Sequence, residues 1–143
     1  MRIEFVNYLS EQYYEILKLR REVLRKPLGL DYNDSQLLEE KDDLFLAYYL
    51  DDKIIGCLLL RPLSQNELKV RQVAVDFNIQ GKGIGLALMK FVENYAKENG
   101  FSKISLHARE TAINFYLKLN YQVLGNKFYE INLAHYKMFK QIY

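Results

Sequence analysis

Hydrophobic residues gather in three runs of strand length in the first half of the chain. The runs lie at Ile3–Val6, Leu44–Leu50 and Ile54–Leu60. The second and third are joined by the short polar segment Asp51-Asp52-Lys53, a spacing typical of a tight hairpin. We therefore expect a first strand and, further along the chain, an antiparallel strand pair.

Between the first strand and the hairpin, apolar residues recur at helical spacing. Ser10 can cap a helix that runs to about Arg25, because its hydroxyl can accept a hydrogen bond from a backbone N–H of the first turn. A short second helix is expected to run through Glu39, with either Asn33 or Asp34 as its cap.

The middle of the chain has the pattern of a strand, a glycine-rich loop, a helix and another strand. A strand is predicted over Glu67–Val75, and it becomes apolar on both faces at Val73-Ala74-Val75, as in a buried strand end. The loop Gln80–Gly85 leads into a helix to about Asn99, whose apolar stripe is Ile84, Leu88, Phe91, Val92, Tyr95 and Ala96. With the strand Lys103–His107 this makes a βαβ crossover, in which the two strands should be parallel.

Three further elements are expected in the C-terminal part of the chain. A helix is predicted from about Glu110 to Leu119, followed by closing strands at Tyr121–Leu124 and Tyr129–Leu133. The expected order is therefore strand, two helices, three strands, helix, strand, helix and two strands.

Composition places the chain among globular proteins. Its 143 residues, 50% hydrophobic and 27% charged, suit a single domain. The one cysteine, Cys57, excludes an internal disulfide and a cysteine-based zinc cluster, and we interpret it as a buried hydrophobe rather than a nucleophile. The N-terminal segment has no signal-peptide pattern and no apolar run reaches the roughly 20 residues of a membrane helix. A cytoplasmic protein without a membrane partner is expected.

Charge argues against one class of partner and singles out one segment. The net charge of +2 comes from interspersed residues, whereas a nucleic-acid-binding protein would show a basic patch. Between Asp31 and Asp43, six carboxylates accompany one lysine, Lys41. The segment is either a solvated acidic loop or a surface that attracts cations.

Gly81, Gly83 and Gly85 introduce the central helix. Without side chains, backbone N–H groups can approach a ligand closely, and a helix N-terminus adds unpaired donors and a positive dipole end. Both suit a phosphate, and Lys82 adds a cation there; the alternative is a tight turn needed only for packing. The spacing fits neither the P-loop nor the dinucleotide fingerprint. It fits Q-x-x-G-x-G, with Gln80 first.

With this loop the chain resembles the GNAT superfamily of acetyl-CoA-dependent N-acetyltransferases, whose acyl-CoA loop is Q/R-x-x-G-x-G/A. The superfamily's later motif, an alanine followed four residues on by a tyrosine, is present in Ala112–Tyr121, so the resemblance covers essentially the whole chain. Segments similar to the small bacterial ElaA-like branch are Leu19–Leu24, His107-Ala108-Arg109, Phe115-Tyr116 and His135–Met138.

The resemblance implies one N-acetyltransferase domain over residues 1–143 with an α/β (α+β) fold. Its central sheet should be mixed and mainly antiparallel, with one parallel strand pair splayed around the acyl-CoA site. The implied reaction is direct transfer of acetyl from acetyl-CoA to a primary amine of a small molecule or peptide, without a covalent enzyme intermediate or a metal. The oligomeric state is open, and a homodimer is one alternative.

The resemblance also assigns roles to residues. Backbone groups of Val73–Val75 should pair with the pantetheine, and an N–H there should stabilise the tetrahedral oxyanion. Tyr116 should protonate the leaving thiolate, since a phenol near pKa 10 is protonated at pH 7; the alternative is a core aromatic. The residues expected to bind acetyl-CoA are Val73, Ala74, Val75, Gln80, Gly81, Lys82, Gly83, Ile84, Gly85 and Asn114.

The chain departs from the superfamily pattern at two positions. Arg109 stands where an asparagine is frequent, seven residues before the tyrosine, which puts a side-chain contact there in doubt. Asn120 replaces a glycine, and asparagine is the next best residue for a left-handed helix end. The second departure should be harmless.

The general base is not identified by the sequence. Candidates are Glu67, His107, His135 or a chain of waters. Each side chain has a structural alternative, a solvated strand charge for the glutamate and a packing role for the histidines. We interpret Arg20 and Arg21 as surface charges on the first helix, although an inward-facing Arg20 would line the acceptor cleft.

Two other functions are compatible with the glycine loop. One is a non-catalytic acyl-CoA-binding regulatory module, and the other is a protein that binds a different nucleotide phosphate. In the resembled superfamily, the segment between the first two helices walls the acceptor side. If the acidic stretch 31–43 attracts cations, the acceptor is a cationic amine.

Overall fold

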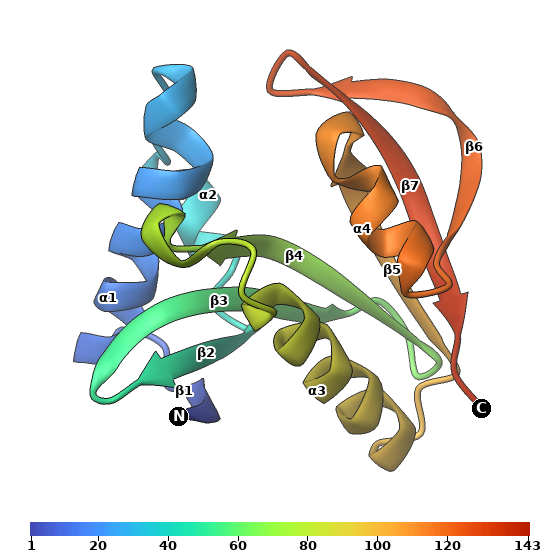
Figure 1. Ribbon diagram of the computed structural model, residues 1–143, viewed down its shortest axis with the longest axis horizontal. Coiled ribbons are helices and arrows are strands. Elements are labelled where there is room, and N and C mark those ends of the chain that lie inside the picture. Colours follow the sequence, from blue (N-terminus) through green and yellow to red (C-terminus); the bar gives the residue numbers. More distant parts are fainter. The chain divides into compact units, whose positions relative to one another are not determined.

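Seven strands and four α-helices make up the fold, and the computed structural model describes all residues 1–143 (Figure 1). In chain order they are β1 (Arg2–Val6), α1 (Glu11–Arg20), α2 (Asp34–Leu38), β2 (Leu44–Leu50), β3 (Lys53–Pro62), β4 (Glu67–Val75), α3 (Ile84–Glu98), β5 (Lys103–Arg109), α4 (Ile113–Lys118), β6 (Gln122–Glu130) and β7 (Leu133–Gln141). The predicted order of helices and strands is confirmed.

The hydrogen-bonded strand order is β1-β2-β3-β4-β5-β7-β6. β4 and β5 pair in parallel, from Glu67 opposite Lys103 to Val70 opposite Leu106. The pairs β1–β2, β2–β3, β5–β7 and β6–β7 are antiparallel. The predicted mixed, mainly antiparallel sheet with one parallel pair is confirmed.

The chain divides into two compact units, which we describe separately. Unit 1 comprises Met1–Arg61 and Gln72–Val92, and unit 2 comprises Pro62–Arg71 and Glu93–Tyr143. β4 and α3 therefore each contribute residues to both units. None of the helices is long and apolar enough to cross a membrane.

The core of unit 1 lies between α1 and the β2–β3 hairpin. Ser10 caps α1, because its hydroxyl accepts the Tyr13 backbone N–H at 3.1 Å. The buried cluster includes Tyr13, Ile16, Leu17, Leu19, Phe45, Ala47, Tyr49, Ile54, Cys57 and Leu59. The hairpin turns at Asp51-Asp52, and Asp51 takes the left-handed φ of 54° that such a tight turn requires.

The first helical run is less regular than the sequence predicts. The α-helix ends at Arg20, and the run continues through a π-helical turn at Arg21–Arg25 and a 3₁₀ turn at Lys26–Leu28. It stops at Gly29, whose φ is 68°. The second helix is capped by Asn33 rather than Asp34, in a capping box in which the Asn33 side chain accepts from the Gln36 N–H.

The closing strands differ from the prediction. The segments Tyr121–Leu124 and Tyr129–Leu133 were expected as the two closing strands, but the first of these strands, β6, runs over Gln122–Glu130 and the second, β7, over Leu133–Gln141. The turn between them is Ile131-Asn132, and both residues have a left-handed φ, 46° and 60°. Because such turns usually contain glycine, residue types alone do not predict a turn at this position.

The glycine-led helix α3 packs closely on the hairpin in unit 1. Ile84, Leu88, Met89 and Val92 are buried, whereas Phe91 of the predicted stripe is half-buried. At Gly56 of β3, an added Cβ would lie 2.8 Å from the Ile84 Cγ2 and 3.3 Å from the Leu88 Cδ1. The missing side chain at Gly56 therefore lets the first turns of α3 approach the sheet.

We expect Gly56→Ala to lower the free energy of unfolding by about 1–3 kcal/mol, the usual cost of inserting a methyl group into a packed contact. Thermal and urea unfolding measure the change. Adding Ile84→Ala removes the clashing methyl group, so the double variant should be less destabilised than the sum of the single variants. Strict additivity would show that Gly56 does not set this approach.

Candidate functional site

The end of β4 combines an interrupted strand pairing with an unusual backbone residue. Pairing with β5 stops at Val70, whereas β4 itself continues to Val75. Gln72 has φ 55°, a left-handed conformation that non-glycine residues rarely adopt within a strand. Val73-Ala74-Val75 follows this left-handed residue, which we call the β4 bulge. Ala74 is buried, Val73 and Val75 are half-buried, and β4 is the middle strand of the seven. The predicted central position of the strand end is therefore confirmed, whereas its burial on both faces is incomplete.

The glycine loop is tethered to the end of β4. The Asp76 side chain accepts the Asn78 N–H at 2.9 Å and starts the 3₁₀ turn Phe77–Ile79. The Gln80 Nε2 then donates to the Val75 carbonyl at 3.0 Å. The structure thus brings the first residue of the predicted Q-x-x-G-x-G loop against the predicted strand segment, and both belong to unit 1.

Two glycines of the loop have conformations that explain their identity. Gly81 and Gly83 have φ values of 81° and 82°, a region open to glycine with little strain. Lys82 between them is exposed. The Gly83 carbonyl accepts the Ala87 N–H at 3.0 Å, so the first backbone N–H groups of α3 have no partner within the helix. Such a helix start can bind an anion.

A Cβ at Gly83 would meet no protein atom within 4 Å. The space beside this residue is therefore open on the protein side. Packing alone does not require a glycine here, although the left-handed φ favours one.

Tyr116 lies on α4 in unit 2, together with Asn114. Its side chain is buried, and burial raises the pKa of its hydroxyl to about 12. Its ring packs edge-to-face against Phe115 at 5.0 Å and Tyr121 at 5.8 Å. Asn114 is exposed. The hydroxyl is thus held protonated at neutral pH and can donate a hydrogen bond.

Asn120 takes a left-handed φ of 69°. Its N–H donates to the Leu117 carbonyl, and the next N–H, of Tyr121, returns to the Tyr116 carbonyl at 3.0 Å. The asparagine therefore supplies the helix end that a glycine supplies elsewhere, as the sequence predicts.

The three candidate bases have different surroundings in unit 2. Glu67 accepts the Ser105 hydroxyl at 2.7 Å and lies 3.9 Å from the Lys103 Nζ. His135 is buried, and its Nδ1 lies 2.8 Å from the Leu133 carbonyl. Both are thus held by structural hydrogen bonds.

His107 is oriented by a carboxylate. Its Nδ1 lies 2.5 Å from the Glu130 Oε1, and its ring contacts Phe128 edge-to-face at 5.0 Å. Burial, followed by the charge of Lys69, lowers the pKa of His107 below its ordinary 6.5, so the ring is neutral at pH 7. With Nδ1 donating to the glutamate, Nε2 is left as the basic atom. The Glu130 partner has no signal in the sequence pattern.

The interpretation of Arg20 as a surface charge is wrong. Its side chain is fully buried in unit 1 and forms two hydrogen bonds with Glu40, at 3.0 and 2.8 Å. Arg21 is exposed, as predicted, and pairs with Asp31 at 2.9 Å. A buried arginine was not expected because its carboxylate partner lies in a different segment of the chain.

The acidic stretch is not an unpaired cluster. Besides Asp31 and Glu40, Asp43 is paired, with Arg61 at 2.7 Å. Half of the six carboxylates are therefore compensated by arginines from elsewhere in the sequence. This pairing reduces the negative charge that the stretch presents, and the capture of cationic acceptors stays a prediction.

Cys57 is fully buried in β3. Burial raises the pKa of its thiol to about 12. The thiol is thus protonated and inaccessible, so the prediction of a buried hydrophobe is confirmed.

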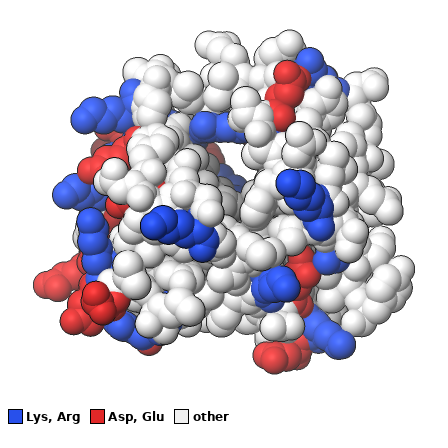
Figure 2. All heavy atoms as spheres, in the orientation of Figure 1, with Lys and Arg blue, Asp and Glu red and all other residues white.

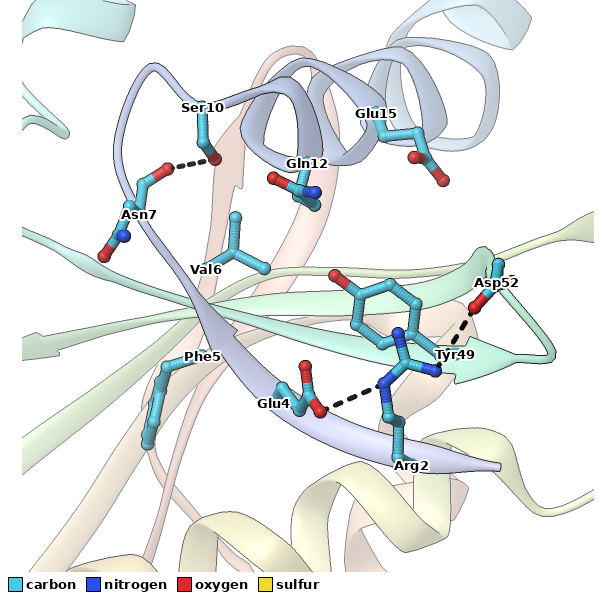
Figure 3. A pocket seen from close by; sticks show the side chains of 10 residues that line it. All are labelled: Arg2, Glu4, Phe5, Val6, Asn7, Ser10, Gln12, Glu15, Tyr49 and Asp52. Atoms are coloured by element: carbon cyan, nitrogen blue, oxygen red, sulfur yellow. Dashed lines mark hydrogen bonds and ion pairs between the residues drawn. The ribbon is translucent and has the colours of Figure 1, made fainter.

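Unit 1 also holds a pocket between β1, the start of α1 and the β2–β3 turn (Figure 3). Figure 3 shows Arg2 over the Tyr49 ring, at 4.1 Å from its centroid. The same guanidinium pairs with Glu4 at 3.0 Å and lies 3.7 Å from the Asp52 carboxylate. The pocket contains none of the predicted site residues. In Figure 2, basic and acidic side chains are interspersed over the visible face.

The chain is similar to known proteins over most of its length. Residues 6–121 match the family described as "Acetyltransferase (GNAT) family". The chain is 26% identical over 133 residues to the Bacillus subtilis (strain 168) protein YyaT, an alignment covering 90% of this chain and 88% of that protein.

Solved structures show the same fold. Escherichia coli ElaA superposes with a TM-score of 0.82 at 19% identity, covering 98% of this chain and 99% of ElaA. An aminoglycoside 6'-N-acetyltransferase complexed with coenzyme A also gives a TM-score of 0.82, at 18% identity, covering 100% of this chain and 98% of that one. At these identities the likeness concerns the fold, and membership of the ElaA-like branch stays a prediction.

Proposed function

Because the chain belongs to the GNAT family of acetyltransferases and is an N-acetyltransferase, we propose that it transfers acetyl from acetyl-CoA to a primary amine by direct attack. The observation that carries the proposal is the loop Gln80–Gly85. Two glycines of the loop have a left-handed φ, and Gln80 is hydrogen-bonded to the Val75 carbonyl. The loop therefore connects a helix start that can bind an anion with the end of a strand whose pairing is interrupted. A fold relative that was solved with coenzyme A supports the same co-substrate.

The loop and the strand end suit two parts of one ligand. The N–H groups at the start of α3 and the Lys82 cation would hold the pyrophosphate. Val73-Ala74-Val75, beyond the last residue paired with β5, would pair with the pantetheine amides. A backbone N–H there would stabilise the oxyanion that forms when the amine attacks the thioester carbonyl. Ile84 and Asn114 complete the proposed acetyl-CoA contacts.

Tyr116 is the proposed acid. As the carbon–sulfur bond breaks, its hydroxyl donates a hydrogen bond to the developing thiolate and then its proton, which solvent restores. The hydroxyl is fully protonated at neutral pH because burial raises its pKa to about 12. With a pKa above that of a thiol, the hydroxyl acts first by stabilising negative charge on sulfur.

His107 is the proposed base, in preference to Glu67 and His135. A neutral imidazole can take the proton that the attacking nitrogen loses, directly or through a water. Glu130 fixes the tautomer and stabilises the imidazolium that forms. Neither of the other two candidates combines a neutral, half-buried base with a carboxylate partner.

The surroundings of Cys57 support direct attack. An acyl-enzyme on the only cysteine would need an accessible thiolate, and this thiol is buried with a pKa of about 12. The acceptor amine is therefore proposed to attack acetyl-CoA itself. The acceptor class is a small molecule or a peptide that presents an amine.

Gly83→Asp should weaken coenzyme A binding at least tenfold, about 1.4 kcal/mol, because a carboxylate would face the pyrophosphate. Gly83→Asn is the matched control, since both residues tolerate a left-handed φ and differ in charge. Isothermal titration calorimetry measures both, with circular dichroism to verify folding. Equal affinities for the two variants would contradict the placement of the phosphates at this loop.

Tyr116→Phe removes only the hydroxyl, so packing and acetyl-CoA affinity should survive. The value of kcat should fall by roughly 10²-fold while KM for acetyl-CoA stays nearly constant. Tyr121→Phe, the same change on the adjacent buried ring, should leave kcat near the wild-type value. A single-turnover rate for Tyr116→Phe equal to wild type would assign Tyr116 to the core alone.

His107→Gln should lower kcat/KM by roughly 10²-fold, a usual loss for a general base. In the wild type, activity should fall as pH drops below the lowered pKa of His107, because protonation removes the base. Glu130→Gln removes the charge that favours the imidazolium, so it should move this acidic limb to lower pH. The pH profile of kcat/KM measures both effects, and an unchanged acidic limb in His107→Gln would exclude this base.

A further inference from the structure

Gln72 is a strained residue at the point where β4 ceases to pair with β5. Its φ of 55° costs a non-glycine residue on the order of 1–3 kcal/mol unless the surroundings fix it. The pairing ends at Val70, and the proposed oxyanion-binding segment begins at Val73. The geometry of this one residue therefore sets the direction of the N–H groups that follow it.

A tyrosine from the segment before α2 holds the Gln72 side chain. The Tyr32 hydroxyl donates to the Gln72 Oε1 at 2.5 Å, and the Tyr32 side chain is buried. Burial raises the pKa of this hydroxyl, which therefore remains a donor over the working pH range. The contact joins residues 40 apart in the sequence, both within unit 1.

Two guanidinium groups contact the Tyr32 ring. The guanidinium carbons of Arg20 and Arg25 each lie 4.5 Å from its centroid. Arg20 is held by its two hydrogen bonds to the buried Glu40. The hydroxyl thus projects from a packed cluster of α1 and the α2 segment, and its position has little freedom.

We propose that Tyr32 is a positioning residue for acetyl transfer: by bonding Gln72 it holds the bulge in β4 that directs the Val73–Val75 N–H groups at the thioester carbonyl. The inference rests on the proposed function. Tyr32 contacts no reacting atom in this scheme and acts through Gln72. Because oxyanion stabilisation depends on donor placement to a fraction of an ångström, loosening the bulge should slow the chemical step and spare the phosphate contacts.

Tyr32→Phe keeps the ring that contacts the two arginines and removes the hydroxyl. We expect kcat to fall about tenfold, as for the loss of one hydrogen bond at its upper value, with unchanged affinity for coenzyme A by calorimetry. Tyr13→Phe is the matched control, because Tyr13 is also buried in this cluster and its hydroxyl, unlike that of Tyr32, is not bonded to Gln72. Its kcat should match the wild type.

Substitutions at Gln72 separate positioning from general stability. Gln72→Gly removes the side chain and the backbone strain, so adding Tyr32→Phe to it should leave kcat unchanged. Gln72→Val has a β-branched side chain that opposes a left-handed φ, and it should lose at least as much kcat as Tyr32→Phe. Thermal unfolding of each variant shows whether a loss of activity follows a loss of fold.

The possible outcomes distinguish the positioning role of Tyr32 from the proposed function. Active wild-type enzyme with full kcat in Tyr32→Phe overturns the positioning role and leaves the proposed function standing. A tenfold loss that persists in the Gln72→Gly background also overturns it, because the effect would not pass through Gln72. Wild-type protein that binds no coenzyme A and acetylates no amine overturns the proposed function itself, and the positioning role with it.

Discussion

β4 is the element on which the rest of the architecture depends. Its first residues pair in parallel with β5, and its last residues belong to the other compact unit, beside α3 and the hairpin. A regular strand would keep one edge in register along its whole length. The left-handed backbone at Gln72 interrupts that regularity, and the residues beyond it, Val73–Val75, are not paired with β5. The glycine loop is tied to the end of this segment, because Gln80 donates a hydrogen bond to the Val75 carbonyl.

The buried Arg20–Glu40 ion pair of unit 1 is linked to the geometry of β4 through Tyr32. A buried ion pair such as Arg20–Glu40 contributes little net stability, because desolvation offsets the attraction, and the Arg20 Nε is buried without a hydrogen-bond partner. The role of the ion pair is to hold neighbouring side chains in place. It fixes the Tyr32 ring, from which one hydroxyl reaches the strained residue of β4. An apolar pair of the same volume would fill the space, but Tyr32 would lose its cation–π contact with Arg20 and keep only the one with Arg25.

Most of the fold was predictable, and the misses have two causes. Periodicity located the strands and helices because burial imposes a spacing of two or 3.6 residues, and the glycine loop was visible because its backbone conformation selects glycine at Gly81 and Gly83. The strand β7 was missed because Ile131 and Asn132 of the preceding turn have left-handed conformations that their residue types do not predict. The Arg20–Glu40 pair and the Tyr32–Gln72 bond were missed because each partner lies far away in sequence, where local pattern carries no information.

The proposed reaction depends on how the reacting groups are positioned rather than on activated side chains. Burial leaves the Tyr116 hydroxyl and the Cys57 thiol with pKa values of about 12 and lowers the pKa of His107. At neutral pH the proposed acid is therefore protonated, the proposed base is neutral, and the core thiol is inert. None of these groups is an activated nucleophile. A reaction of this kind gains its rate from holding amine, thioester and N–H donors in register. A strained strand residue clamped by a buried tyrosine serves that purpose, since a rigid bulge loses no further freedom when the substrate arrives.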